Sequence, residues 1–324
     1  MKLSYLDLVN INEGETILDA YQRSVAIAQK LEEFGYQRIW VAEHHNMKGI
    51  GSAATSLIIS HLAANTKRIK IGAGGIMLPN HSPLVIAEQF GTLETLYPGR
   101  IELGLGRAPG TDGITMRALR RDRLSSESFP QDVLELQNYF SKDEDGSRIR
   151  AVPGKGLEVP LWILGSSTFG ARLAAEYGLP YAFASHFAPD ALYEAISTYR
   201  EYFKASKQLA KPYVMLGVNI ILAESKSEAE FLATSQRQVF SGLIRGKSMR
   251  FPKPVEPSVL SFSAPETAMA DKMLRVSFVG TRESVQVELN QFIHETRADE
   301  LMVVSSIYDR DQKIKSLKLI SKLF

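Results

Sequence analysis

Short apolar runs alternate along the chain with stretches in which apolar residues recur every three or four positions. The short runs predict buried strands, and the longer periodic stretches predict amphipathic helices. The first predicted pairs are a strand at 3–9 with a helix at 16–34, and a strand at 38–42 with a helix at 52–66. Gly35 directly follows the first helix, as expected of a residue that ends one.

The same alternation continues through the rest of the chain. Further strands are predicted at 68–78, 100–106, 160–165, 180–185, 213–223 and 298–307, and further helices at 81–90, 130–140, 168–178 and 188–206. Such alternation produces right-handed strand–helix–strand units and a parallel sheet. Eight repeats in 324 residues fit a (β/α)8 TIM barrel of the α/β class better than an open doubly wound sheet. We therefore expect one barrel domain that spans residues 1–324.

Two stretches break this rhythm. Residues 107–126 are basic and predicted to be loop-like, and residues 245–274, between the seventh and eighth strands, hold four prolines and little periodicity. Long irregular stretches inside a compact domain are usually functional lids or disordered segments. We expect residues 245–274 to be an insertion that covers the barrel mouth as a lid. The alternative is a surface loop without a role.

Composition narrows the class of protein. Apolar residues make up 44% of the chain and charged residues 23%, as in ordinary soluble proteins. The formal charge of +2 is close to neutral and does not indicate a basic surface that binds nucleic acid. No apolar run approaches the ~20 residues of a membrane span, and the first residues lack a signal-peptide pattern. The absence of cysteine excludes disulfides and thiolate chemistry. We expect a cytoplasmic protein without nucleic-acid or membrane partners.

Candidate chemistry follows the second predicted strand, where Glu43, His44 and His45 stand together. Active sites of TIM barrels form at the C-terminal ends of the strands. Adjacent side chains on a strand point to opposite sides, so we expect one histidine to face the barrel mouth and the other to provide support. An imidazole suits proton transfer at neutral pH, but a hydrogen-bonded structural histidine is the alternative. A metal site would need a third ligand such as His81 or His186, and because no metal-spacing motif is present we expect none.

A second candidate site follows the fifth strand. Gly165, Ser166, Ser167 and Thr168 form a small polar turn directly before a predicted helix. A helix N-terminus with free N–H groups and the positive end of the helix dipole is a ready anion site. Arg107, which follows the fourth strand, could add a charge-assisted contact to a phosphate. The alternatives are plain helix capping by the hydroxyls and a surface salt bridge by the arginine.

Glycines end the third and fourth strands. The run "GLGRAPG" at 104–110 resembles a dinucleotide fingerprint but fails it, because Pro109 holds the third glycine position and no helix is predicted to begin there. Gly74 and Gly75 end the run "GAGG". Glycines at such a position let a flat group approach the backbone, or they make a tight bend at the barrel rim.

Taken together, these motifs resemble a known family. Residues 40–112, from "WVAEHHNMKGIG" to "LGLGRAPGTD", and again "ILGSSTFGARLAAEYGLP" at 163–180, are similar to the bacterial luciferase-like, flavin-dependent monooxygenases in order and spacing. The resemblance implies an (α/β)8 barrel that binds FMN in its reduced form (FMNH2), delivered by a separate NAD(P)H-dependent flavin reductase. It also implies the use of dioxygen to oxygenate a small organic substrate, and a homodimer.

The resemblance also implies roles for individual residues. His44 matches the catalytic histidine of the family, and Gly74 and Gly75 match a pair of small residues beneath the flavin ring that is often joined by a cis peptide bond. Arg107 and the turn 165–168 match the phosphate-binding positions. The irregular segment before the last strand matches the family's active-site lid.

Some choices stay open. Light-emitting members carry a cysteine just before the arginine, where this chain has Gly106, so we do not expect light emission. A flavin-binding protein without catalysis would carry the same residues. A third reading replaces FMN by the deazaflavin F420 and makes the protein a hydride-transfer enzyme, and a metal hydrolase is a distant fourth.

Overall fold

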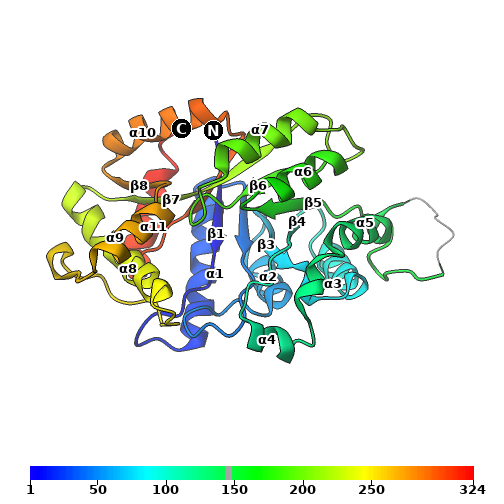
Figure 1. The fold of residues 1–324 in the computed structure, drawn as a ribbon, viewed down its shortest axis with the longest axis horizontal. Coiled ribbons are helices and arrows are strands. Elements are labelled where there is room, and N and C mark those ends of the chain that lie inside the picture. Colours follow the sequence, from blue (N-terminus) through cyan, green and yellow to red (C-terminus); the bar gives the residue numbers. More distant parts are fainter. Residues whose placement is uncertain (143–147) are drawn as a thin grey trace.

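In the computed structural model, which describes residues 1–142 and 148–324 except for the side chain of Arg123, eight parallel strands close into a barrel (Figure 1). Their order around the barrel is β1-β2-β3-β4-β5-β6-β7-β9, and β6 pairs with β7 to complete the ring. The strands are β1 Lys2–Asp7, β2 Arg38–Val41, β3 Lys70–Met77, β4 Ile101–Gly106, β5 Leu161–Gly165, β6 Tyr181–Phe183, β7 Val214–Leu222 and β9 Glu300–Val304. This arrangement confirms the predicted TIM barrel.

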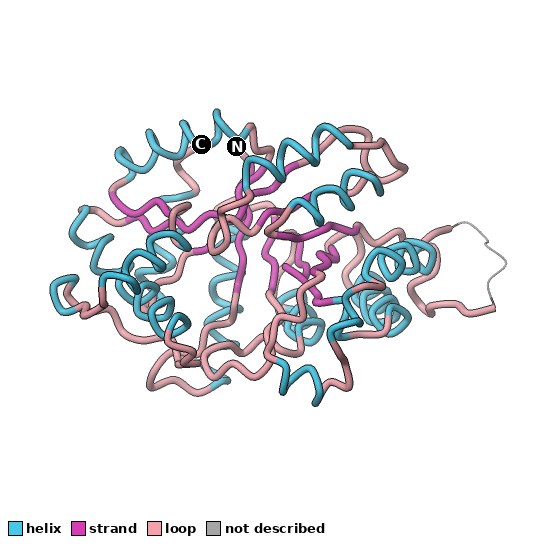
Figure 2. Tube along the Cα trace, viewed as in Figure 1, coloured by secondary structure: helices cyan, strands magenta, loops and turns pink. Residues whose placement is uncertain are grey.

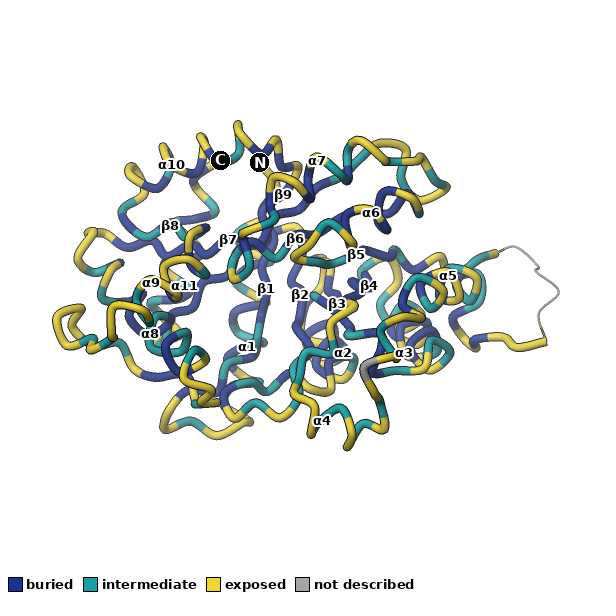
Figure 3. The backbone as a smooth tube through the Cα atoms, viewed as in Figure 1, coloured by how far each residue is buried: buried dark blue, intermediate teal, exposed yellow. Residues whose placement is uncertain are grey.

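Helices surround the barrel and cover the outer faces of its strands (Figure 2). The α-helices are α1 Ile17–Glu33, α2 Thr55–Ala64, α3 Pro83–Leu96, α4 Gly113–Ala118, α5 Phe129–Phe140, α6 Thr168–Tyr177, α7 Leu192–Tyr202, α8 Lys226–Ile244, α9 Ala264–Met273, α10 Arg282–Thr296 and α11 Arg310–Ile320. Short 3-10 turns occur at η1 Leu78–Asn80, η2 Arg123–Ser126 and η3 Pro257–Val259. Figure 3 shows buried strands in the centre and helices that expose their outer sides. Within the described ranges, no helix has the length and apolarity needed to cross a membrane.

Helix α1 illustrates how local sequence sets these elements. Thr16 and Asp19 form a capping box in which each side chain accepts a hydrogen bond from the other residue's backbone N–H. Two backbone N–H groups at the start of the helix, which have no partner within it, are thereby hydrogen-bonded. The apolar residues Ile27 and Leu31 then lie on one face, where they are buried against the barrel. Gly35, at φ +82°, takes the left-handed conformation that follows many helix ends.

The stretch between β7 and β9 contains more structure than the sequence analysis predicts. The nine residues of β7 pair first with β9 and then, from Asn219 onward, with an additional short strand, β8 Ser277–Gly280. Helices α8 and α10 flank this region, and neither is predicted. The loop-like stretch 107–126 also contains α4, a helix of six residues that buries none of them. A helix without a buried face leaves no periodic apolar signal in the sequence.

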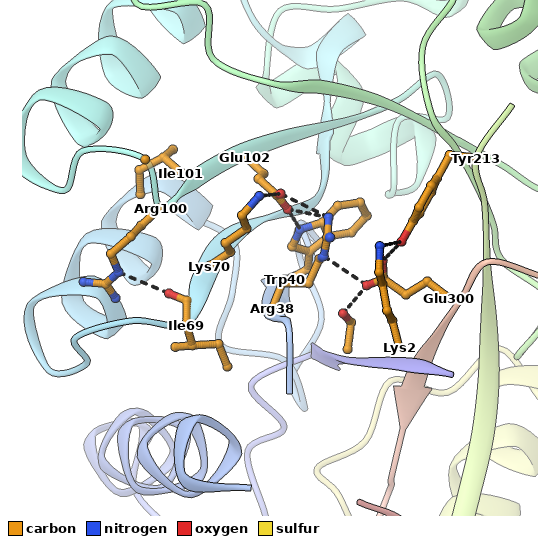
Figure 4. A network of polar contacts seen from close by, with 12 residues as sticks. Lys2, Arg38, Trp40, Ile69, Lys70, Arg100, Ile101, Glu102, Tyr213 and Glu300 are labelled. Atoms are coloured by element: carbon orange, nitrogen blue, oxygen red, sulfur yellow. Dashed lines mark hydrogen bonds and ion pairs between the residues drawn. The ribbon is translucent and has the colours of Figure 1, made fainter. Parts of the chain in front are cut away.

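A buried ionic network fills the N-terminal end of the barrel (Figure 4). Arg38 Nη1 lies 2.8 Å from Glu102 Oε2, and Arg38 Nε lies 3.0 Å from Glu300 Oε1. Trp40 Nε1 donates to the same Glu102 oxygen over 3.2 Å, and Tyr213 Oη donates to Glu300 Oε2 over 2.7 Å. Because Arg38, Glu102 and Glu300 are all buried, each depends on the others for its charge compensation.

Candidate functional site

A cavity of about 660 Å³ lies at the C-terminal ends of the barrel strands. This volume is in the range of ~300–1,000 Å³ that is typical of small-molecule sites. Seven of the eight predicted site residues line it, namely His44, Gly74, Gly75, Arg107, Gly165, Ser166 and Ser167. Thr168, the first residue of α6, does not line the cavity.

Gly74 and Gly75 present bare backbone to this cavity, and the peptide bond between them is cis. A Cβ atom added to Gly75 would lie 2.7 Å from the carbonyl oxygen of Gly104, and one added to Gly74 would lie 2.9 Å from Cβ of Trp40. The neighbouring strands therefore leave no room for a side chain at either position. The backbone that results can lie directly against a flat ring.

One corner of the cavity suits an anion. Arg107 follows β4 with its guanidinium carbon 4.0 Å from the centre of the Phe169 ring, which holds the cation at the cavity edge. Ser167 is the N-cap residue of α6, yet its side chain makes no capping hydrogen bond. The exposed hydroxyls of Ser166 and Ser167 and the first N–H groups of α6 are thus available to a ligand. Among the described residues that line the cavity, none is an aspartate or a glutamate.

The paired histidines take different positions. His44 lines the cavity, whereas His45 Nε2 lies 2.8 Å from Oε1 of Glu43, away from it. Burial lowers the pKa of His44, although a hydrogen bond to the backbone of Gly110 and the charge of Glu43 act in the opposite direction. His44 therefore presents a neutral imidazole to the cavity at pH 7.

Glu43 is the centre of a buried hydrogen-bond cluster. Besides the contact with His45, its carboxylate lies 2.9 Å from His81 Nε2 and accepts hydrogen bonds from the backbone N–H of Met77 over 3.0 Å and from Asn80 Nδ2 over 3.2 Å. Asn80 Nδ2 also donates to the carbonyl oxygen of Pro109 over 2.9 Å. The cluster thus joins the loops that follow β2 and β4, which carry His44 and Arg107, to the end of β3, the strand that contains the glycine pair.

This arrangement predicts a pH-dependent loss of stability in Glu43→Gln. Burial alone would raise the pKa of Glu43, but the hydrogen bonds from His45 and His81 outweigh it and lower this pKa from 4.5 to about 2. A folded-state pKa below the unfolded value stabilises the protein above pH 4.5, and this contribution is lost as the pH falls toward 2. At pH 7, Glu43→Gln should therefore lower the free energy of unfolding by about 3 kcal/mol.

Urea denaturation of wild type and Glu43→Gln at pH 7 and at pH 3 measures this difference. We expect the gap between the two proteins to be smaller at pH 3. A gap of the same size at both pH values would show that Glu43 does not act as a hydrogen-bonded carboxylate.

The same three side chains have the composition of a metal site. Their ligand atoms, on Glu43, His45 and His81, lie within 4.8 Å of one another. However, both imidazoles already contact the carboxylate at hydrogen-bond distance, and two further donors complete its surroundings. An ion is not needed to compensate the buried charge, so the absence of a bound metal remains our prediction. Metal analysis of the purified protein would test it.

The stretch between β7 and β9 supplies the wall of the cavity above the strands. Residues of α8, of the segment 247–251 and of α9 line it, among them Phe240, Met249 and Met273. The segment 247–251 is tied to other loops: the backbone N–H of Lys48 donates to Ser248 Oγ over 2.8 Å. The predicted lid region therefore borders the site, and its opening and closing remain a prediction.

Several residues that line the cavity were not predicted from the sequence to be part of a flavin site. His186, Asn219 and Gln236 line the cavity, and six of the nine methionines do so within the part of the chain that the structure describes. These methionines are Met47, Met77, Met215, Met249, Met273 and Met302. They are scattered along the sequence and form no motif, so only the fold shows that they line one cavity.

Comparisons with known proteins identify the family. The sequence model of the family described as luciferase-like monooxygenase matches residues 1–300. A protein of Escherichia coli strain K12 named luciferase-like monooxygenase is 50% identical over 98% of this chain and 95% of its own length. The chain belongs to the luciferase-like monooxygenase family. This membership makes the protein an oxidoreductase.

Other relatives extend the comparison. The N-acetyl-S-alkylcysteine monooxygenase of Bacillus subtilis strain 168 is 31% identical over 99% of this chain and 97% of its own length. The structure of MsnO8 without ligand superposes with a TM-score of 0.88, at 32% identity, over 100% of this chain and 98% of that one.

Two more distant structures share the barrel fold but bind different cofactors. The oxygenating constituent of 3,6-diketocamphane monooxygenase from Pseudomonas putida, in complex with FMN, has a TM-score of 0.72 at 16% identity over 99% of this chain and 97% of that one. An F420-dependent secondary alcohol dehydrogenase has a TM-score of 0.71 at 17% identity over 98% of this chain and 97% of that one. Proteins with this barrel fold thus bind FMN in one case and F420 in the other.

Proposed function

We propose that the protein is the oxygenating component of a two-component, FMN-dependent monooxygenase. It would take reduced FMN from a separate NAD(P)H-dependent flavin reductase and use dioxygen to oxygenate a small organic substrate. The observation that carries this proposal is the order of groups along one cavity. A cationic, hydroxyl-rich corner at Arg107 and Ser166–Ser167 suits the phosphate, and bare backbone at Gly74–Gly75 suits the ring.

In this proposal, reduced FMN supplies the two electrons that activate dioxygen. Arg107, the two serines and the N-terminus of α6 bind the phosphate, and Gly74 and Gly75 allow the ring to lie against β3. His44 holds or moves a proton next to the ring, for which its neutral form at pH 7 is suited. The methionines and phenylalanines of the wall exclude water from the reacting groups.

The wall of the cavity also bears on the substrate. Thioether and aromatic side chains favour an apolar ligand, and methionine adapts its shape to the ligand that it contacts. The relative named N-acetyl-S-alkylcysteine monooxygenase makes a thioether the first compound class to assay. N-Acetyl-S-methylcysteine and an aliphatic aldehyde are suitable first probes. As in the family resemblance, we further propose that the protein is a homodimer.

The reaction is tested by supplying a flavin reductase, NADH and FMN under ¹⁸O₂ with a panel of thioethers and aldehydes. We expect one ¹⁸O atom in the product of at least one compound, only when the protein is present. Binding of reduced FMN without oxygen transfer to any compound would favour a flavin-binding protein without catalysis.

The alternative that a specific observation favours is F420-dependent hydride transfer, because an F420-dependent dehydrogenase shares the fold. This enzyme would reduce F420 with an alcohol and would need no dioxygen. Anaerobic reduction of F420 by the protein with a secondary alcohol such as 2-propanol would support it. Turnover that requires dioxygen and reduced FMN would exclude it.

Arg107→Ala should weaken the binding of reduced FMN by about 10–100-fold, since a charge-assisted hydrogen bond to a phosphate contributes more than a neutral one. Anaerobic calorimetry with reduced FMN measures the change. Arg117→Ala is the matched control because Arg117 is exposed on α4 and does not line the cavity. Equal affinities of wild type and Arg107→Ala for reduced FMN would show that the phosphate does not bind in this corner of the cavity.

A further inference from the structure

A second histidine faces the cavity from the side opposite His44. His44 follows β2 and His186 follows β6, and these two strands are diametrically opposed in the barrel order. Burial lowers the pKa of His186, and a positive charge on a protonated His44 would lower it further. The chain therefore places one imidazole on each side of the space where ligands bind.

The ring of His186 is held in a fixed place. It occupies the space above Gly217 of β7, where an added Cβ atom would lie 2.3 Å from His186 Nδ1. Phe187 contacts the ring edge-on, with 5.0 Å between the ring centres. The backbone is fixed too, because the His186 carbonyl oxygen accepts a hydrogen bond from Asn219 Nδ2 over 2.6 Å, and Asn219 Oδ1 accepts one from Gln236 Nε2 over 2.7 Å.

Despite this fixed position, the ring has no hydrogen-bond partner in the described part of the protein. His186 Nδ1 is buried and unpaired, and Nε2, which is not buried, makes no hydrogen bond to a described residue either. A neutral imidazole has one donor and one acceptor, and buried polar groups are rarely left unpaired in native structures. With Nδ1 against Gly217, Nε2 is the nitrogen that a ligand in the cavity can reach.

The partner of this nitrogen should be uncharged. Burial, together with His44, lowers the pKa of His186 to about 4, so the ring is neutral at pH 7. Among the described residues, His44 is the titratable group that acts on it, and the cavity that it faces is also lined by apolar residues such as Met215 and Phe240. A neutral donor in apolar surroundings suits a carbonyl oxygen or a similar acceptor rather than an anion.

We propose that His186 donates a hydrogen bond from Nε2 to an uncharged acceptor of the substrate, such as a carbonyl oxygen attached to an apolar chain. The substrate is its partner rather than the flavin, because the residues proposed to hold FMN lie in β3 or follow β4 and β5, whereas His186 follows β6 and lies over Gly217 of β7. This inference rests on the proposed function in that it takes the flavin to occupy the other side of the cavity.

A matched pair of probes tests the hydrogen bond without turnover. 2-Octanone has an acceptor oxygen, and 2-methyl-1-octene has a CH₂ group in its place with nearly the same shape. Their binding is followed by ligand-detected NMR titration under anaerobic conditions, with and without reduced FMN. In His186→Leu, the affinity for 2-octanone should fall by about 5–10-fold, as expected for one lost hydrogen bond, while that for 2-methyl-1-octene stays within about twofold.

Two further variants separate binding from folding. Gly217→Ala keeps the imidazole but displaces it, so it should cause the same selective loss, and His186→Gln, which keeps an N–H donor, should restore part of the affinity. His294→Leu, an exposed position on α10, is the control for the substitution itself.

Three outcomes would overturn the proposal: an equal loss for both probes, a loss of reduced-FMN affinity in His186→Leu, or no binding of 2-octanone to the wild type. These binding measurements need no oxygen transfer. The hydrogen bond of His186 can therefore be disproved while the protein is shown to be a monooxygenase, and it can be confirmed while no oxygen transfer is found.

Discussion

His44→Ala should lower turnover with reduced FMN, dioxygen and substrate by about 10²–10⁴-fold, the usual contribution of a positioned proton donor or acceptor. The imidazole lines the cavity, and its lowered pKa keeps it neutral and able to accept a proton at pH 7. Alanine leaves a space but no group that can hold the proton. Steady-state rates of product formation, with the flavin reductase in excess, measure the effect.

The pH dependence provides a second readout of the same residue. Because burial lowers the pKa of His44 below 6.5, wild-type kcat/KM should fall only at a pH below 6.5, where the imidazole becomes protonated. His61→Ala, an exposed position on α2, is the control substitution. Unchanged turnover in His44→Ala would show that His44 takes no part in the reaction.

Arg38→Met should lower the free energy of unfolding by about 3–5 kcal/mol, since it leaves buried carboxylates without their partner. Arg38 contacts both Glu102 and Glu300, and these three side chains are at most 8% exposed. The methionine side chain fills part of the space but cannot compensate either charge. Urea denaturation at pH 7 measures the change.

Lys70→Met is the matched control for the network. Lys70 also pairs with Glu102, over 3.2 Å, but its side chain is 45% exposed, so its loss should change the free energy of unfolding by no more than about 1 kcal/mol. Equal effects of the two substitutions would mean that burial does not determine the strength of this network.

The barrel was predictable because its strands are buried on both faces and read as short apolar runs between amphipathic helices. The predictions failed where this contrast disappears. Helix α8 buries Thr234, Ser235 and Gln236 among its apolar residues, which dilutes its periodic pattern, and β8 has only four residues. Helix α10 does carry helical apolar spacing at Val285, Leu289 and Phe292, so this helix was predictable from the sequence.

The sequence allowed the location of the site residues to be predicted better than the side chains that they contact. Residues in the C-terminal part of a strand, or directly after it, meet at one end of a barrel, so the placement of the glycine pair, His44 and Arg107 around one cavity could be expected. The contact between Glu43 and His81 joins residues 38 positions apart, and no spacing rule indicates it. The position of His186 over Gly217 likewise depends on the pairing of β6 with β7.

Anaerobic calorimetric titration of the purified protein with reduced FMN, with reduced F420 as the competing ligand, tests the central claim most directly. We expect one reduced FMN bound per chain and no displacement of it by an equal concentration of reduced F420. No binding of reduced FMN, or its displacement by reduced F420, would contradict the proposed FMN-dependent function.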